Sequence, residues 1–375
     1  MYHRVALALF LILFVSCSSR QQKRHSFYYW KLDNYGRIDS AEVRKIDSMG
    51  VEHFYIHMMD VDWSEVRKMP VPINTTGNVD AYATRTYTPV VFITNRVFEQ
   101  MPDNWCDTLA RKIKFKLALE TANIGSNSMY DSISQRMKRM KVEWYDSTYQ
   151  RKYDSVSKAY KNEMLERRLK GIQVDCDWTA KTKDKYFRFL RELRKQLPGM
   201  ELSATVRLYP YKYRKKMGVP PVDRVVLMCY NLGGITTPQT VNSVFDLKEL
   251  EKYLEVKDYP LPMEIALPVF GWYAWFRGPQ FKGVIYETPE LVAAGAFSKR
   301  EQNNSLVIRD TVVQNRYLRE GDILRMEYPN ANEVEQAAAL ITRKIPNYRG
   351  IVFYHWHLPS VKRYENAIQN IYRAY

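Results

Sequence analysis

Cysteine is scarce in this chain, which has four in 375 residues. Four cysteines in so long a chain cannot form the disulfide framework of a small secreted domain, and no Cys-x-x-Cys pair or His/Cys cluster has the spacing of a zinc site. His355 and His357 lie two residues apart, but no third ligand is identifiable, so we predict no metal site. The sequence also lacks a Gly-rich phosphate-binding loop and the ordered Ser, His and Asp residues of a catalytic triad. We expect no cofactor.

The apolar run Val5–Val15 is too short to span a bilayer and has the length of a signal-peptide core. It ends in Phe14-Val15-Ser16-Cys17, which resembles the lipobox of bacterial lipoproteins. The resemblance implies a signal peptide over residues 1–16, lipidation of Cys17, and a short tether over residues 17–25. We therefore expect a lipid-anchored protein of the bacterial cell envelope, in the outer membrane. A plain secretory signal or an uncleaved anchor is the alternative.

Acidic residues are outnumbered, because 57 Lys and Arg stand against 41 Asp and Glu, giving a formal charge of +16. Removing residues 1–16 takes away only Arg4, so 16 − 1 = +15 belongs to the remaining chain. Such a charge favours an anionic partner such as nucleic acid, a lipid surface or an acidic polymer. Export argues against nucleic acid, and no basic-region heptad, zinc finger or RNA-binding aromatic motif supports it. The oligomeric state is not predicted.

Short β-rich apolar runs alternate with helical patterns along most of the chain, which is typical of βαβ units and a parallel sheet. Eight such runs predict an α/β fold, a closed (β/α)8 TIM barrel over residues 26–375. The expected strands are Phe27–Asp33, His53–Asp60, Pro89–Thr94, Gly171–Trp178, Leu202–Leu208, Arg224–Asn231, Glu264–Phe270 and Gly350–His357.

Two long stretches interrupt this alternation, and we expect them to wall a cleft at the strand ends. Residues 104–170 predict a helical insertion after the third strand, and residues 278–329 a small α+β insertion after the seventh. Residues 131–170 hold 11 Lys and Arg against 6 Asp and Glu. This segment is either a solvated helical insertion or an electrostatic contact with the envelope surface or an anionic glycan. In the second case the protein could be an envelope scaffold.

The run Gly171–Trp178 carries the strongest chemical signal. Residues two apart on a strand share a face, so Gln173, Asp175 and Asp177 should point towards the barrel interior and its mouth, with Trp178 facing the other way. Two carboxylates from one strand end push their pKa values apart, which is how a general acid arises. The alternative is a structural pair that binds helix N-termini or loop amides.

The same run resembles the fourth-strand motif of glycoside hydrolase family 18, the chitinases and endo-β-N-acetylglucosaminidases, in which alternating acids end in a catalytic Glu. Matches to the fifth, sixth, seventh and last strands of that family follow in chain order: Leu202–Val206, Val222-Asp223 with Met228–Asn231, Ile265–Trp272 and Phe353–Trp356. The resemblance implies hydrolysis of β-linked N-acetylhexosamine glycans. A sister group of bacterial lipoproteins with the same barrel is another candidate relative.

In the mechanism that this resemblance implies, the substrate's own N-acetyl oxygen is the nucleophile, so one protein acid suffices. Asp177 takes the place of the catalytic Glu and protonates the leaving oxygen, while Asp175 orients and charge-stabilises the acetamido group. Asp is one methylene shorter than Glu, so its carboxyl would fall about 1–1.5 Å short, which can cost about a hundredfold in rate. The residues expected to contact the sugar are Tyr230, Asn231, Gln173 and, stacked beneath the ring, Trp356.

Two of the family's acids are missing, since Lys170 and Gln173 stand in their places. These replacements favour the alternative of a non-catalytic glycan-binding barrel. Arg207 would neutralise an acidic sugar or pair with Asp175 or Asp177. Aromatic rings near the mouth would bind sugar or pack in the wall, namely Tyr28, Trp30 and Trp272. Asp60 and Asp62 are rim acids or a runner-up catalytic pair, unless they are simply solvated loop residues.

Overall fold

The computed structural model describes residues 24–30, 40–75, 85–123, 129–255, 258–288, 291, 295–299 and 303–375. The expected signal peptide, Cys17 and all of the expected tether except its last two residues lie outside this set. Among the helices of the described ranges, none has both the length and the apolar character needed to cross a membrane.

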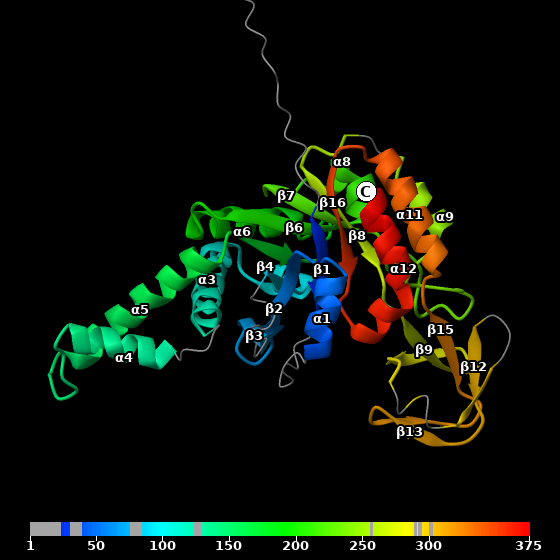
Figure 1. Cartoon of the computed structure of the whole chain (residues 1–375), viewed down its shortest axis with the longest axis horizontal. Helices are drawn as coiled ribbons and strands as arrows, with labels where there is room; N and C mark the ends of the chain where they lie inside the picture. The colour runs from blue at the N-terminus through cyan, green and yellow to red at the C-terminus, as the bar shows by residue number, and fades with distance from the viewer. Residues whose placement is uncertain are drawn as a thin grey trace, which may run out of the picture.

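Eight parallel strands form a closed barrel in the centre of the molecule (Figure 1). Their order around the barrel is β1-β16-β8-β7-β6-β5-β4-β2, and pairing of β1 with β2 closes the ring. The predicted (β/α)8 barrel is confirmed, and each expected run contributes a strand. The bounds are β1 His25–Tyr29, β2 His53–Ser64, β4 Thr86–Ile93, β5 Gly171–Asp175, β6 Glu201–Arg207, β7 Arg224–Met228, β8 Met263–Pro268 and β16 Tyr348–Tyr354.

One further strand of this sheet was not predicted. β3 (Met69–Thr75) pairs antiparallel with the end of β2, which extends beyond its expected end at Asp60. Pro70 and Pro72 make this strand hard to predict from the sequence, because proline cannot donate a hydrogen bond to a strand ladder and is tolerated mainly at a sheet edge. β3 lies at such an edge, next to β2.

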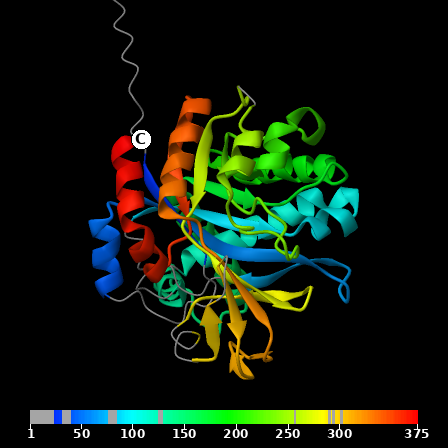
Figure 2. The same cartoon turned by 90° about the vertical axis from the view of Figure 1, so that its right-hand side faces the viewer.

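Helices pack around the outside of the barrel, with α11 and α12 side by side against it (Figure 2). The apolar spacing of Tyr186, Leu190, Leu193 and Leu197 predicts one buried helix face, and the first three are buried in α6. The sequence predicts a capping box at Asn332 and Glu335, but the capping box of α11 lies two residues earlier, at Asn330 and Glu333. The helix bounds are α1 Ser40–Ser48, α2 Asn95–Gln100, α6 Lys183–Gln196, α7 Leu208–Lys212, α8 Arg214–Met217, α9 Leu247–Tyr253, α11 Ala331–Lys344 and α12 Leu358–Ala374, with a 3-10 turn at Asp103–Trp105.

Two groups of elements extend from the barrel. Between β4 and β5, α3 (Cys106–Ala122) is followed by α4 (Met129–Arg139) and α5 (Tyr149–Arg168), which project as an arm (Figure 1). Between β8 and β16 lies a five-stranded antiparallel sheet in the order β10-β9-β15-β12-β11, with a separate hairpin of β13 and β14. The strands of this sheet and of the hairpin are β9 Trp272–Arg277, β10 Gln280–Ile285, β11 Phe297–Lys299, β12 Asn304–Val307, β13 Thr311–Val313, β14 Arg316–Leu318 and β15 Ile323–Glu327.

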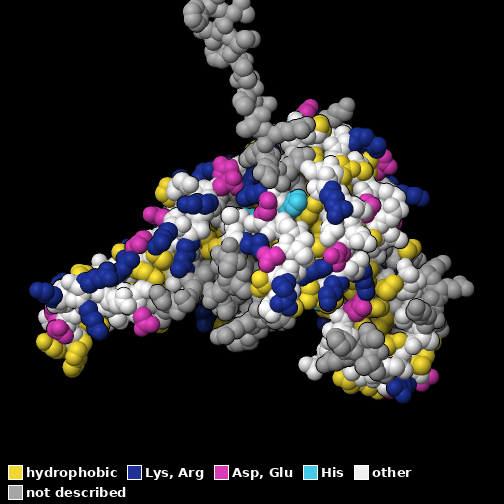
Figure 3. Space-filling model, viewed as in Figure 1, with side chains coloured by type: hydrophobic (Ala, Val, Ile, Leu, Met, Phe, Trp, Pro, Cys, Tyr) yellow, Lys and Arg dark blue, Asp and Glu magenta, His cyan; other side chains and the backbone are white. Residues whose placement is uncertain are grey.

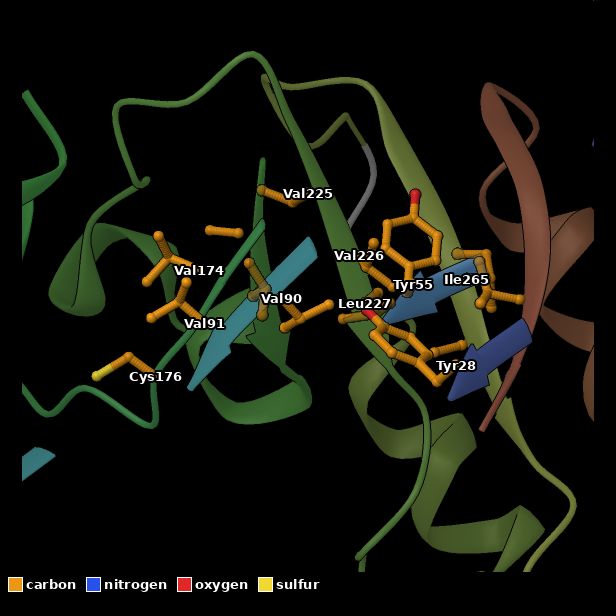
Figure 4. Packing of buried hydrophobic residues seen from close by; sticks show 14 of the residues in the cluster. Tyr28, Tyr55, Val90, Val91, Val174, Cys176, Val225, Val226, Leu227 and Ile265 are labelled. Atoms are coloured by element: carbon orange, nitrogen blue, oxygen red, sulfur yellow. The ribbon is translucent and has the colours of Figure 1, made fainter. Parts of the chain in front are cut away.

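A buried ionic cluster fills the end of the barrel where the strands begin. The guanidinium of Arg224 contacts both the carboxylate of Glu264 and the hydroxyl of Tyr55, which also donates to Glu264. Arg224 is 8% exposed and Glu264 4%. Tyr28 stacks on Tyr55 with ring centroids 4.9 Å apart (Figure 4). The interior is therefore closed at this end, and a ligand has to enter from the opposite mouth.

Candidate active site

The end of β5 carries the predicted polar residues into the barrel. Gln173 is fully buried, and its Oε1 accepts a 2.6 Å hydrogen bond from the hydroxyl of Tyr28. Asp175 is 7% exposed, and its Oδ1 accepts a 2.5 Å hydrogen bond from the hydroxyl of Thr205 on β6. Gln173 and Asp175 thus share the inner face, as the strand alternation predicts.

Asp175 and Asp177 occupy different environments. Burial, reinforced by the nearby carboxylate of Asp177, raises the pKa of Asp175 to about 7. Near neutral pH the protonated and ionised forms of Asp175 are therefore present in similar amounts. Asp177 follows the end of β5, its side chain is 49% exposed, and its Oδ2 lies 3.2 Å from the Arg207 Nη1. Of the two roles considered for Arg207, pairing with a carboxylate is the one seen.

A cleft of about 550 Å³ opens where β5, β6 and β7 end. Four of the predicted site residues line it together: Asp177, Arg207, Tyr230 and Asn231. Trp178, which was expected to face away from the barrel interior, also lines the cleft. Lining residues that were not predicted include Tyr209 and Lys216. The aromatic and basic run from Tyr209 to Lys216 directly follows a barrel strand, and segments in that position face the mouth, so this run was the available signal.

Aromatic rings crowd the mouth beside this cleft. Tyr230 stacks on Tyr354 at a centroid distance of 4.9 Å, and Trp30 and Tyr28 lie 5.5 and 5.6 Å from the same Tyr354 ring. Burial raises the pKa of the Tyr230 hydroxyl well above its usual value, so this hydroxyl stays a donor. Tyr28 is 1% exposed, whereas Trp30 and Tyr354 are half-buried. The half-buried rings are the ones that a ligand can reach.

Trp356 does not lie in the mouth. It is fully buried between the barrel wall and α1, edge-on to Phe27 and Phe54, and its Nε1 donates a 2.8 Å hydrogen bond to Glu42. Its predicted role as the floor of a sugar subsite is therefore wrong, because no face of its ring is free to stack on a ligand. Tyr354, two residues earlier, faces the mouth instead.

Three other predicted substrate contacts are also engaged by protein partners. Gln173 and Tyr28 are buried against each other, so the expected direct contact of either with substrate is not what the structure shows. Trp272 is half-buried, and its Nε1 donates a 2.9 Å hydrogen bond to Glu327. Its ring also packs against Phe270 at 5.4 Å.

The acids at the end of β2 have structural partners. Asp60 accepts hydrogen bonds from His57 at 2.6 Å and Asn74 at 2.9 Å. Asp62 pairs with Arg96 at 2.6 Å. Although partial burial opposes it, hydrogen bonds from Thr94 and Arg96 hold the pKa of Asp62 below its usual value. These contacts favour a structural role for both carboxylates.

Within the described ranges, no cluster of three or more His, Cys, Asp or Glu side chains is placed to hold a metal ion.

No protein-family model matches this sequence, and no curated protein is similar to it in sequence. Structures with a similar arrangement include the Bacillus cereus spore cortex-lytic enzyme SleL, 15% identical over 93% of this chain and 75% of its own, with a TM-score of 0.46. A fungal endo-β-N-acetylglucosaminidase from glycosyl hydrolase family 18 is 7% identical over 94% of this chain and 98% of its own, with a TM-score of 0.45.

The xylanase and α-amylase inhibitor protein XAIP-II of Scadoxus multiflorus is 9% identical over 93% of this chain and 98% of its own, with a TM-score of 0.45. The strand pairing itself defines the chain as a (β/α)8 barrel protein. The structural similarities assign it no activity.

Proposed function

We propose that this barrel binds a β-linked N-acetylhexosamine glycan in the cleft above β5, β6 and β7 and hydrolyses it. The observation that carries the proposal is the carboxylate pair at the end of β5, in which Asp175 is buried with a raised pKa and Asp177 lies in the cleft. Two carboxyl groups in unequal environments that share one proton suit acid catalysis at a glycosidic oxygen. The half-buried rings of the mouth offer apolar surfaces for sugar rings.

Asp177 is the proton donor in this proposal, because its exposed carboxyl is the one that a bound glycan reaches. In the free protein the carboxylate of Asp177 pairs with Arg207, and burial favours the protonated form of Asp175. A bound glycan that displaces Arg207 lets this proton pass to Asp177. The leaving oxygen takes it as the glycosidic bond breaks, while the acetamido oxygen of the substrate bonds to the anomeric carbon. Ionised Asp175 then stabilises the positive charge on the acetamido group.

Tyr230 and Asn231 line the same cleft and would hydrogen-bond the acetamido group. Water completes the reaction by attacking the anomeric carbon as its bond to the acetamido oxygen breaks, and the proton that the water loses returns to Asp177. No group beyond the substrate, water and these side chains is needed to balance the atoms and charges.

A second candidate function is glycan binding without hydrolysis. The 3.2 Å ion pair between Arg207 and Asp177 favours it, because the guanidinium occupies the carboxyl that has to reach the glycosidic oxygen. The shorter side chain of Asp compared with Glu also favours binding without hydrolysis, because its carboxyl lies farther from the glycosidic oxygen.

Incubation with chitooligosaccharides, followed by both product analysis and binding measurements, separates the two functions. The proposed hydrolase forms products, and Asp177→Asn abolishes turnover while binding is kept. Asp223→Asn is a matched control, because Asp223 is also about half exposed and pairs with Arg194 at 2.9 Å, but at the opposite end of the barrel. Binding without product selects the second function, and no binding overturns both. Unchanged turnover of Asp177→Asn excludes Asp177 as the acid.

The cellular setting belongs to the proposal as well. We propose export and lipid anchoring at Cys17 in the bacterial cell envelope, supported by the lipobox-like run Phe14–Cys17. The glycan would then be a component of the envelope or of the surroundings.

A further inference from the structure

The arm formed by α4 and α5 has no part in the proposed cleft. α5 alone contains 20 residues, which corresponds to about 30 Å of helix, and it leads away from the barrel to a free end (Figure 1). The arm has a small apolar core of its own, which includes Ile133, Met137, Tyr160 and Met164. It is therefore a packed projection, and its free end is held away from the barrel.

The turn between α4 and α5 presents large apolar side chains to solvent. Trp144 is 78% exposed, Tyr145 72% and Met140 55%. Hydrophobic side chains gather visibly at this end of the arm (Figure 3). A contiguous exposed group of this kind marks an interaction site. We call these three residues the tip.

Positive charge surrounds the tip. Residues 138–152 contain five cations, Lys138, Arg139, Lys141, Arg151 and Lys152, against two carboxylates, Glu143 and Asp146. Asp146 is paired with Lys152 at 3.2 Å. In the described part of the chain, no carboxylate lies within ion-pair distance of Lys138, Arg139 or Lys141, and all three are exposed. Basic side chains follow the arm towards its end (Figure 3).

We propose that the tip inserts into the interfacial region of an anionic phospholipid bilayer, with the surrounding Lys and Arg side chains on the lipid headgroups. Trp and Tyr are the residues that favour this interface, and basic residues beside them bind anionic headgroups. The ring planes of Trp144 and Tyr145 meet at 81°, so the pair forms a wedge and not the flat platform on which a sugar stacks. The apolar Met140 side chain also suits lipid better than a polar glycan.

The depth of Trp144 in the bilayer tests this proposal directly. The full chain is mixed with vesicles whose phospholipids carry bromine on the acyl chains, with and without phosphatidylglycerol. Bromine quenches tryptophan emission at close range, and the difference between the protein and Trp144→Phe isolates Trp144 from the other seven Trp residues. This local readout is needed because the apolar run Val5–Val15 could itself attach the chain to vesicles.

We expect quenching of Trp144 on vesicles that contain phosphatidylglycerol and its loss in high salt. Replacing Lys138 and Lys141 together with Gln should lower the ratio of inserted to free tip about 25-fold, about fivefold for each cation. Tyr286→Ser is the control, because Tyr286 is 52% exposed but lies in the β10 region away from the arm, and quenching should be unchanged.

Two results would overturn the proposal. One is equal quenching of the protein and Trp144→Phe on anionic vesicles, which means that the tip stays in water. The other is a change in Trp144 emission with an anionic polysaccharide but not with vesicles, which makes the arm a glycan-binding surface. The tip side chains are exposed, so equal thermal unfolding of the variants verifies that they fold.

Discussion

Replacing Asp175 with Asn should make the protein more stable at alkaline pH, although it removes a carboxylate from the proposed site. The pKa of Asp175 is raised from 3.8 to about 7 in the folded protein, because the side chain is buried beside Asp177. At about 1.4 kcal/mol per pKa unit, this difference corresponds to about 4 kcal/mol. Above pH 7 the ionised carboxylate therefore lowers the free energy of unfolding by an amount of this order.

The sign follows from the proton balance. Below pH 3.8 both states of the protein hold the proton, so the carboxyl contributes no difference. Between about pH 4 and pH 7 the unfolded chain has lost the proton and the folded protein keeps it, so stability falls by about 1.4 kcal/mol per pH unit. Above pH 7 the penalty is constant. Asparagine does not titrate and removes this dependence.

The assay is urea unfolding of the protein and of Asp175→Asn, at about pH 5 and about pH 8. The stability of the variant relative to the protein should rise by about 2.5 kcal/mol between these two pH values. Asp62→Asn is the control. The lowered pKa of Asp62 places both conditions above its titration, so its replacement should cost the same stability at each. If the stability of Asp175→Asn relative to the unsubstituted protein is the same at both pH values, the pKa of Asp175 is not raised and the reasoning is refuted.

Three other predictions concern the barrel base, the corrected tryptophan and the anchor. Arg224→Met leaves Glu264 buried without its cation and should cost about 3–5 kcal/mol in urea unfolding, whereas a double replacement that also changes Glu264 to Leu should recover more than half. Trp356→Phe loses the hydrogen bond to Glu42 and should lower the free energy of unfolding by about 1–3 kcal/mol. Glycan binding should be unchanged, and weaker binding would show that Trp356 contacts the ligand. Cys17→Ser should abolish the incorporation of labelled fatty acid into the protein in an exporting bacterium. Equal incorporation into the protein and the variant would contradict lipidation at Cys17.

The barrel could be predicted because its signals are local. Alternation of side chains along a strand and alternation of strands with helices are both written in short segments, and all eight strands were found. β3 was missed because its prolines argue against a strand in any position except an edge, and sequence alone does not say which strands are edges. The cap of α11 was ambiguous for a different reason. Asn330 and Glu333 have the same spacing as Asn332 and Glu335, and both pairs fit a capping box.

The direction of the side chains was predicted well on β5 and poorly at the end of β16. Gln173 and Asp175 lie within β5, where the pleat fixes which side chains point inwards. Trp356 lies two residues beyond the end of β16 at Tyr354, where no ladder constrains the chain, and its side chain turns to the outer wall. The cleft residues Tyr209 and Lys216 were missed because they belong to short helices after β6, and no alternation applies there.

The end of β5 also explains why two acids only two residues apart, Asp175 and Asp177, differ in their chemistry. β5 ends at Asp175, so the ladder holds this side chain inside the barrel, where burial favours the protonated form. Asp177 lies beyond the ladder, and its carboxyl is exposed to the cleft and to Arg207. A proton acceptor held in the strand and a second carboxyl on the segment after it make an asymmetric pair. One keeps the proton away from water, and the other can reach a ligand. In the proposed mechanism the end of the strand, more than the identity of the two acids, assigns their roles.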